Sequence, residues 1–204
     1  MCKTYKNQKW IKGLLTKLYK SGILNLINGT GYISISNDFN EIISMKWRTC
    51  VKVIMGADAA GFSLKEAIKE SLQKRGYEII DTTAEEPLLF QVAAQAVAEG
   101  VQSGEALRGI ALCGTGMGVS IICNKHQGVY AALCESVYQA RRAKTVNNTN
   151  VLCMGGFIIG NEMGIEMALG WLEAEHLKDL EPEMKRIVVQ EFDELVRFEE
   201  EIYR

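Results

Sequence analysis

The residues best suited to chemistry lie in one stretch, where the apolar run 110–112 ends at Cys113 and glycines follow at Gly114, Gly116 and Gly118. A short apolar run bounded by glycines is typical of a strand that is covered on both faces of a parallel sheet. Cys113 would then stand at the carboxyl end of that strand, where ligands bind in open α/β sheets. Alternating glycines let backbone N–H groups turn toward an anion, and a following helix would point its amino end there. We therefore predict a thiol beside an anion-binding loop.

The glycine pattern alone does not identify the ligand. The dinucleotide fingerprint has its third glycine further along the chain, and a nucleotide-binding P-loop ends in Lys-Ser/Thr, which is missing here. A dinucleotide-dependent oxidoreductase is therefore only a third choice. A tight strand-to-helix turn without any ligand would use the same glycines, but Cys113 and Thr115 beside three glycines favour a site.

Composition narrows the class of protein. The chain has 204 residues, of which 48% are hydrophobic, and a net charge of -2, which suits one core and argues against nucleic acid as a partner. The six cysteines form no Cys-x-x-Cys pair and mostly lie in or beside apolar runs, and the two histidines are far apart. This pattern indicates reduced, buried thiols in a cytoplasmic protein. We expect neither a metal nor a cofactor, and no membrane partner.

Residues 1–49 differ from the rest of the chain. Lysines dominate there, no acidic residue precedes Asp38, and 28–31 and 34–40 are loop-like. Apolar residues within 11–18 fall on one face of a basic amphipathic helix, which leaves open a role at a membrane surface or in targeting. Lysines interrupt the apolar stretch, which argues against a signal peptide. Our preferred interpretation is an extension outside the fold, with Met45 as the native beginning.

From residue 50 onward, predicted strands and helices alternate. The strands are expected at 50–55, 77–81, 110–113, 129–134 and 151–154, and the helices at 64–75, 92–101, 119–122, 135–144 and 163–175. In the first of these helices Leu64, Ile68 and Leu72 share a face, with lysines elsewhere. Five alternations with short connections specify a parallel sheet with right-handed crossovers. We predict a three-layer, Rossmann-like α/β domain with a five-stranded parallel sheet over residues 50–176.

A further helix is predicted within residues 177–204. Pro182 opens a segment whose apolar residues repeat at helical spacing, namely Met184, Ile187, Val188, Phe192, Leu195, Val196 and Ile202. No face of the sheet remains for this helix to cover. We therefore expect its apolar stripe to pack on another subunit, with packing on its own domain as the alternative.

Residues 50 to about 175 resemble the type B ribose-5-phosphate isomerases and the galactose-6-phosphate isomerase subunits. The motifs that carry the resemblance, in chain order, are Gly56-Ala-Asp58-x-Ala-Gly61 with Leu64-Lys65, Ser103-Gly-Glu105 before Arg108-Gly-Ile110, Cys113-Gly-Thr-Gly-Met-Gly-Val-Ser120, Asn124-Lys125, Ala131-Ala-Leu133 and Asn147-Asn-x-Asn150. The resemblance implies a Rossmann-like fold, an obligate dimer with sites at the subunit interface, no metal, and aldose–ketose interconversion of sugar phosphates.

The resemblance also implies roles for individual residues. Cys113 matches the catalytic base that moves a proton between C1 and C2 through a cis-enediolate, which suits a thiolate beside loop amides. Amides from Gly114 through Gly116 to Gly118 would bind the enediolate oxygen, an effect of roughly 3–4 kcal/mol per donor in other enzymes. Thr115 matches a threonine that assists near the ring oxygen of the sugar.

The resemblance implies roles for three further residues, in binding the substrate or in supporting the loop. Asp58 and Asn147 match positions that contact sugar hydroxyls and the enediolate, and Ser120 would support the loop. Alignment with the family motifs does not identify the residue that binds the phosphate. We assign this role to Arg186, with Lys185, Arg141, Arg142 and Lys144 as alternatives.

The sequence departs from the family pattern at several of its functional positions. Ala59 and Val146 stand where the ribose-5-phosphate isomerases have histidines, the second of which opens the sugar ring. The segment 86–90 replaces Asp-Tyr-Pro, and 177–180 replaces the Gly-Gly-Arg-His that supplies phosphate-binding arginines. A tetrose 4-phosphate needs no ring-opening histidine because its only ring-forming hydroxyl is blocked.

We therefore predict an isomerase of an acyclic tetrulose 4-phosphate, and family members that act on such substrates also lack both histidines. Ribose-5-phosphate and galactose-6-phosphate are the alternative substrates. A chain without catalysis of its own, which binds a phosphosugar, is the alternative from another class. The expected assembly is a homodimer or tetramer, with a paralogous partner subunit left open.

Overall fold

The computed structural model of the chain describes residues 24–26, 33–35 and 51–204. The chain divides into two units, Met1–Arg48 and Thr49–Arg204. In the first unit, β1 (Leu24–Leu26) pairs with β2 (Ile33–Ile35) in antiparallel register. The loop predicted over 34–40 is therefore wrong at its first two residues, where an alternating Ile-Ser-Ile suits a strand. The predicted helix within 11–18 and the loop over 28–31 lie outside the described residues.

The second unit contains a five-stranded sheet in the order β4-β3-β5-β7-β6, and all neighbouring strands are parallel. Its strands are β3 (Lys52–Ala57), β4 (Glu78–Asp81), β5 (Arg108–Cys113), β6 (Ala131–Leu133) and β7 (Val151–Gly155). The three central strands β3, β5 and β7 are almost wholly buried, as continuous apolar runs in a sheet covered on both faces should be. The predicted five-stranded parallel sheet is confirmed.

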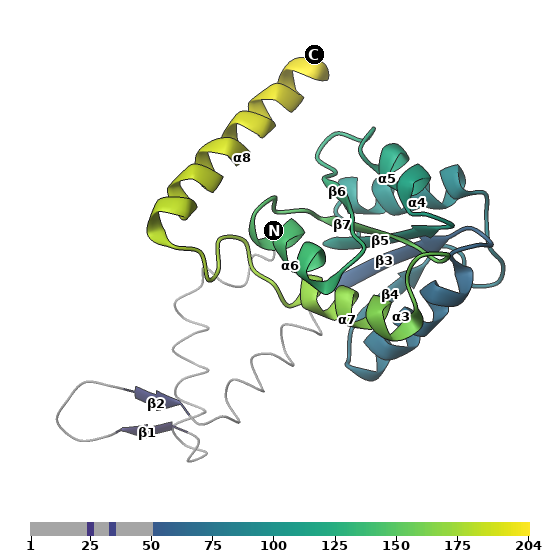
Figure 1. Cartoon of the computed structure of the whole chain (residues 1–204), viewed down its shortest axis with the longest axis horizontal. Coiled ribbons are helices and arrows are strands. Elements are labelled where there is room, and N and C mark those ends of the chain that lie inside the picture. Colours follow the sequence, from purple (N-terminus) through teal and green to yellow (C-terminus); the bar gives the residue numbers. More distant parts are fainter. Residues whose placement is uncertain (1–23, 27–32, 36–50) are drawn as a thin grey trace. The chain divides into compact units, whose positions relative to one another are not determined.

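Helices cover both faces of this sheet (Figure 1). They are α3 (Phe62–Lys74), α4 (Phe90–Gln102), α5 (Met117–Cys123), α6 (Val137–Thr145) and α7 (Asn161–Leu172). One apolar core lies between the sheet and α3, α6 and α7, and a second lies between the sheet and α4 and α5. The predicted three layers are confirmed, with element ends shifted by at most three residues.

Alternation along β5 decides which way its side chains point. Ile110 and Leu112 belong to the core under α3, α6 and α7, whereas Ala111 and Cys113 belong to the core under α4 and α5. Small residues on the second face let the alanine-rich α4 lie close to the sheet. A Cβ added at Gly109 would lie 2.7 Å from the side chain of Val97 in α4. The thiol therefore faces the α4 and α5 layer.

The C-terminal segment forms a single helix, α8 (Pro182–Ile202), which lies outside the three layers in Figure 1. The ring of Phe192 meets those of Tyr130 and His176 at centroid distances of 5.6 and 5.5 Å. The carboxylate of Glu199 accepts hydrogen bonds from the Tyr130 hydroxyl at 2.8 Å and the Gly128 amide at 2.6 Å. This helix thus contacts its own domain, which was the alternative expectation.

Much of the apolar stripe of α8 is nevertheless exposed to solvent. Its exposed large apolar side chains are those of Met184, Ile187, Val189, Leu195, Phe198 and Ile202. Among the described residues, no helix combines the length and the apolar character needed to cross a membrane.

Candidate active site

Loops that follow β3, β5 and β7 meet at the carboxyl edge of the sheet, the edge at which these parallel strands end. The amide of Asp58 donates to the carbonyl of Leu112 at 3.2 Å, and the amide of Gly156 donates to the carbonyl of Cys113 at 2.8 Å. The amide of Phe157 donates to the carbonyl of Gly114 at 2.9 Å. These bonds extend the strand register and bring the predicted Asp58 and Cys113 together.

The thiol is held by the glycine loop. The Gly116 amide donates to the Cys113 sulfur over 3.1 Å, and this side chain keeps only 6% of its surface exposed. Gly116 is the N-cap of α5 and has a left-handed φ of 76°, a conformation that suits glycine. A backbone N–H donor is therefore directed at the sulfur. Thr115 lies exposed on the same loop, and Ser120 is half-buried in α5.

The glycine loop is also crowded. A Cβ added at Gly116 would lie 2.8 Å from the backbone of Met154. A Cβ at Gly114 would lie 2.8 Å from the ring of Phe157, and one at Gly118 would lie 2.8 Å from the ring of Phe90. The two rings are 76% and 40% exposed. The sequence does not predict either ring as a neighbour of the site, because no local pattern shows which ring will contact which glycine.

One oxygen of Asp58 stabilises its own loop. Oδ1 accepts hydrogen bonds from the amides of Ala60 at 2.9 Å and Gly61 at 3.0 Å, which is a common use of a loop aspartate. The carboxylate is half-buried, and its Oδ2 has no hydrogen-bond partner within the described ranges. Asp58 can therefore hold its turn and still offer one oxygen to a ligand. Ala59, where the resembled family has a histidine, is exposed beside it.

Asn147 lies at the other end of the sheet. It precedes β7, whose Val151 pairs with Gly109 and whose Gly155 pairs with Cys113. At about 3.3 Å per residue, the length of β7 alone separates Asn147 from Cys113 by about 13 Å. This exposed asparagine instead lines a surface hollow of about 270 Å³ together with Asn124 and Tyr130. A single chain does not bring Asn147 to the thiol.

The carboxyl edge carries no cation on its loops. Segments 58–61, 82–89, 114–116, 134–136 and 156–160 contain neither lysine, arginine nor histidine, but they contain Asp58, Glu85, Glu86 and Glu135. An anionic substrate would therefore find no charge partner on these loops of one chain. The predicted Arg186 lies exposed on α8, where its guanidinium pairs with Glu183. Arg141, Arg142 and Lys185 lie on α6 and α8 as well.

Lys144 is the least suited of the proposed phosphate ligands. It is 5% exposed, and its Nζ donates to the Asn148 side chain at 2.6 Å. Burial, together with the positive charge of Arg108, lowers the pKa of Lys144 to about 7. Its ammonium is therefore only partly charged near neutral pH and points into the protein.

The other described cysteines are chemically quiet. Cys123, Cys134 and Cys153 are buried and free. Burial raises the pKa of Cys134 to about 11, and a hydrogen bond with Cys123 together with burial raises that of Cys153. In the described part of the chain, no group of three or more His, Cys, Asp or Glu residues is placed to hold a metal ion.

The fold is that of a Rossmann-like α/β protein, with a thiol beside a glycine loop as its candidate site. Comparison with known proteins identifies its family. Residues 53–188 match the Ribose/Galactose Isomerase family, so the chain belongs to that family and is a sugar isomerase, an intramolecular oxidoreductase. The predicted family and class of reaction are confirmed.

Individual relatives agree with this assignment. A 4-deoxy-4-sulfo-D-erythrose isomerase from Clostridium sp. (strain MSTE9) is 42% identical over 157 residues, covering 76% of this chain and 99% of the relative. A D-erythrulose-4-phosphate isomerase from Pectobacterium atrosepticum is 39% identical over 61% of this chain and 84% of its own length. The solved structure of ribose-5-phosphate isomerase B from Clostridium thermocellum is similar with a TM-score of 0.67, 33% identity, and coverage of 74% of this chain and 99% of that one.

The left-handed glycine of the loop provides a first test. Gly116→Ala should lower kcat/KM by at least about 100-fold, because loss of one oriented backbone donor has effects of that size. Gly104 is a matched control, since its φ of 78° is also left-handed but no atom lies within 4 Å of an added Cβ. Gly104→Ala should cost about 1–2 kcal/mol of unfolding free energy and leave the kinetics intact. Equal kinetics for the two variants, measured beside urea unfolding, would show that the Gly116 turn is not needed.

The lowered pKa of Lys144 predicts a pH dependence of stability. Between pH 7 and 10.5 the unfolded chain holds a proton that the folded chain has lost, so the free energy of unfolding should rise with pH by up to about 1.4 kcal/mol per unit. Lys144→Met should remove this rise, whereas Lys74→Met, on the exposed face of α3, should keep it. The difference between wild-type and variant urea-unfolding curves across this range measures the effect. Parallel pH profiles would contradict it.

Proposed function

We propose that this chain interconverts the aldose and ketose forms of an acyclic four-carbon sugar with an anionic group at C4. The observation that carries the proposal is that a thiol, Cys113, lies in the glycine loop, while Val146 stands where the ribose-5-phosphate isomerases have their ring-opening histidine. A sugar of this kind forms no ring, because its C4 oxygen is esterified or replaced. Isomerisation of an open chain needs one base near C1 and C2 and no acid–base pair for ring opening.

The reaction then uses few groups. The Cys113 thiolate removes the proton from C2 of the aldose, and the electron pair forms a cis-enediolate. Return of the proton to C1 and transfer of a proton between O1 and O2 give the ketose. Amides of the glycine loop stabilise the enediolate oxygen. Thr115 donates to the substrate from the same loop, the free oxygen of Asp58 accepts a sugar hydroxyl, and Ser120 supports the loop.

The substrates of two relatives indicate which anionic groups the sugar could carry at C4. One acts on a 4-sulfo sugar and the other on a 4-phosphate, and both substrates lack a free hydroxyl at C4. We therefore take a tetrose or tetrulose with a 4-phosphate or 4-sulfonate as the substrate class. Ribose-5-phosphate and galactose-6-phosphate remain the alternative substrates. The lack of cations on the carboxyl edge favours one further alternative, a non-catalytic subunit that binds a phosphosugar beside an active partner.

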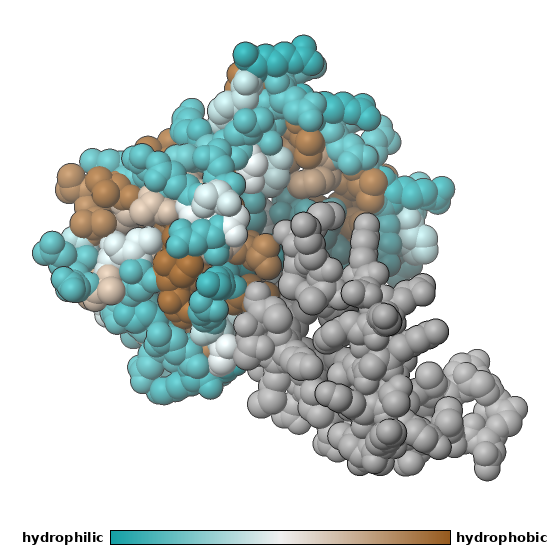
Figure 2. Space-filling model, turned by 180° about the vertical axis from the view of Figure 1, so that it is seen from behind, coloured by the Kyte–Doolittle hydropathy of each residue, from teal (hydrophilic) through white to brown (hydrophobic). Residues whose placement is uncertain are grey.

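We further propose that a second copy of the chain completes the site. The Cys113 thiol and Asp58 lie at the carboxyl ends of the strands, and Asn147 lies at their amino ends. A second copy that places its amino-end loops against the carboxyl-end loops of the first would bring its Asn147 to that thiol. Exposed apolar side chains around the carboxyl edge support such a contact, namely those of Leu89, Phe90, Met117, Ile121, Phe157 and Ile158. Figure 2 shows apolar surface exposed on this unit. The cation for the anionic group, assigned to Arg186, would come from the partner with the exposed stripe of α8.

Domain roles and location complete the proposal. We propose residues 50–176 as the isomerase domain and 177–204 as a helix at the subunit interface; the family match supports the first boundary, since it begins at residue 53, and it runs on to residue 188. Residues 1–49 are proposed to be an extension outside that domain. Free thiols at all four described cysteines support a cytoplasmic location.

The substrate class is tested by direct assay. We expect turnover of erythrulose 4-phosphate or 4-deoxy-4-sulfo-erythrose to exceed turnover of ribose-5-phosphate and galactose-6-phosphate in kcat/KM. Cys113→Ala should abolish turnover, since it removes the base, while Cys134→Ala keeps the catalytic thiol and serves as the control. Ring sugars turned over as well as the acyclic substrates would refute the proposed class.

The shared site is tested by complementation. Cys113→Ala and Asn147→Ala homodimers should both have very low activity, because each site in them lacks one group. Random mixing of the two chains should restore about a quarter of the wild-type activity, because half of the dimers then hold one intact site. Activity should be measured after the subunits have been exchanged in mild denaturant. No recovery, or an active Asn147→Ala homodimer, would show that the partner does not supply this residue.

A further inference from the structure

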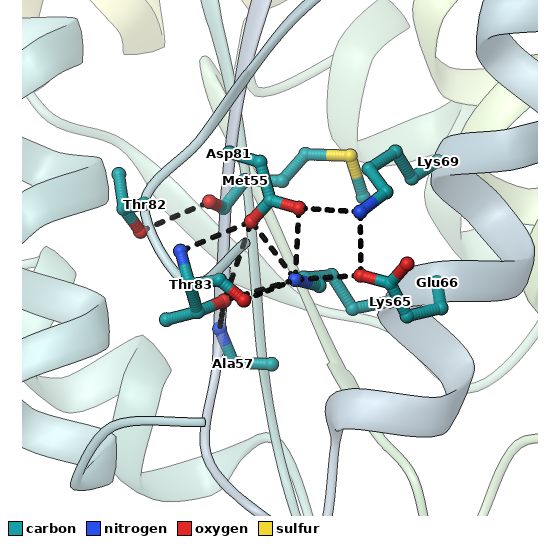
Figure 3. Close-up of polar contacts among 8 residues, drawn as sticks. All are labelled: Met55, Ala57, Lys65, Glu66, Lys69, Asp81, Thr82 and Thr83. Carbon is teal, nitrogen blue, oxygen red and sulfur yellow. Dashed lines mark hydrogen bonds and ion pairs between the residues drawn. The ribbon is translucent and has the colours of Figure 1, made fainter. Parts of the chain in front are cut away.

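Lys65 in α3 is fully buried. The sequence predicts instead that the lysines of this helix lie away from its apolar face. The Lys65 side chain has 0% exposure. Nζ donates to both carboxylate oxygens of Asp81 at 2.8 and 2.9 Å, and to the carbonyl and hydroxyl oxygens of Thr83 at 2.8 and 3.1 Å. Figure 3 shows these contacts converging on the ammonium. A buried ammonium is tolerated only where such partners replace water.

Two further side chains balance the charge of this cluster. Lys69 Nζ contacts Asp81 Oδ2 at 2.7 Å and Glu66 Oε1 at 2.6 Å, and Lys65 Nζ lies 2.8 Å from the same Glu66 oxygen. Two cations therefore face two carboxylates. Burial alone would raise the pKa of Asp81, but the hydrogen bonds from the two lysines outweigh it and hold that pKa below its ordinary value. The Asp81 carboxylate is therefore ionised at neutral pH.

The cluster ends at the backbone of the active-site loop. The hydroxyl of Thr83 accepts a hydrogen bond from the amide of Ala57 at 3.2 Å, in addition to the one from Lys65. Its own proton is directed toward Asp81 Oδ1 at 3.4 Å. Because Lys65 and Asp81 fix both the donor and acceptor directions of this hydroxyl, its position is specified. Ala57 is the last residue of β3 and directly precedes Asp58.

The same loop is tied down from its other side. The carbonyl of Ala57 accepts from the amide of Leu88 at 3.3 Å, and the carbonyl of Met55 accepts from the Thr82 hydroxyl at 3.0 Å. Residues 82–88 therefore follow the end of β3 and lead into Phe90, whose ring lies on Gly118. The buried cluster is thus connected through the backbone to Asp58 and, through the ring of Phe90, to Gly118 at the start of α5.

We propose that Thr83, oriented by Lys65 and Asp81, is a positioning residue that fixes the Asp58 loop for substrate binding. Well-packed apolar residues would stabilise this junction as well as a buried ion cluster does. The cluster offers what apolar packing does not, a single direction for the hydroxyl that holds the Ala57 amide. This inference rests on the proposed function, in which Asp58 binds the sugar.

The experiment compares Thr83→Val, which keeps the shape but removes the hydroxyl, with Thr83→Ser, which keeps the hydroxyl. Thr83→Val should lower kcat/KM about 10- to 100-fold, mainly through KM, because misplacement of a binding group by about 1 Å costs up to about 100-fold. Thr83→Ser should restore the wild-type KM to within about threefold. Amide hydrogen exchange at Ala57 and Asp58 should speed up in the valine variant only.

Lys52→Met provides the control. The pair Lys52–Glu78, at 2.8 Å, joins the same two strands β3 and β4 at their opposite ends and is about half exposed. Its loss should leave KM, kcat and the exchange at Ala57 unchanged. All variants are assayed at temperatures where urea unfolding shows them to be folded.

The possible outcomes separate the two proposals. A Thr83→Val protein that is less stable but has an unchanged KM would overturn the positioning role, as would valine and serine variants with equal KM. Should the valine variant not fold, Thr83→Ala takes its place, and failure of both would assign the hydroxyl to folding alone. A wild-type protein without isomerase activity on four-carbon sugars would refute the proposed function, whereas exchange at Ala57 would still report whether Thr83 fixes the loop.

Discussion

The active site depends on backbone segments that approach too closely for side chains to lie between them. A Cβ added at Gly156 would lie 2.2 Å from the carbonyl oxygen of Ala60, and one at Gly61 would lie 2.7 Å from Leu112. Three loops therefore interlock through glycines, and hydrogen bonds between them continue the sheet beyond the strand ends. These close approaches restrict the loop to the conformation in which the Gly116 amide donates to the Cys113 sulfur. The geometry of the candidate site is consequently a property of the backbone.

The parallel arrangement of the strands also determines at which end of the sheet the charged loop residues lie. All carboxyl ends lie at one edge, and the loops there are acidic and apolar, which is unfavourable for an anionic substrate within one chain. The described loop cations Arg75, Lys125 and Lys178 lie on connections that enter strands or follow α7, away from Cys113. A protein that binds a sugar anion at this edge must therefore bring cations to it from elsewhere. The exposed apolar rim and the exposed stripe of α8 suit an assembly that would do so.

The sequence was sufficient for most of the fold, because strand and helix periods are local properties. Buried runs such as 151–154 and the position of Cys113 at a strand end could be predicted from hydrophobicity and glycines alone. Contacts between distant segments could not. Phe192 and Glu199 contact Tyr130, which is distant in the sequence, and no local sequence pattern predicts these contacts. Lys65 has the sequence context of a surface lysine, and only its meeting with Asp81 makes its burial possible.

The two positions at which the resembled family has histidines, Ala59 and Val146, lie at opposite ends of the strands in one chain. Ala59 follows Asp58 at the carboxyl edge, whereas Val146 precedes Asn147 at the amino edge, so the two side chains do not share a packing environment within one chain. Loss of one therefore places no steric demand on the other. In the proposed assembly, the carboxyl-end loops of one copy meet the amino-end loops of the other, so Ala59 of one chain and Val146 of its partner would lie at the same substrate. The resemblance assigns ring opening to the histidine at the position of Val146, and an open-chain sugar would leave that residue without a role.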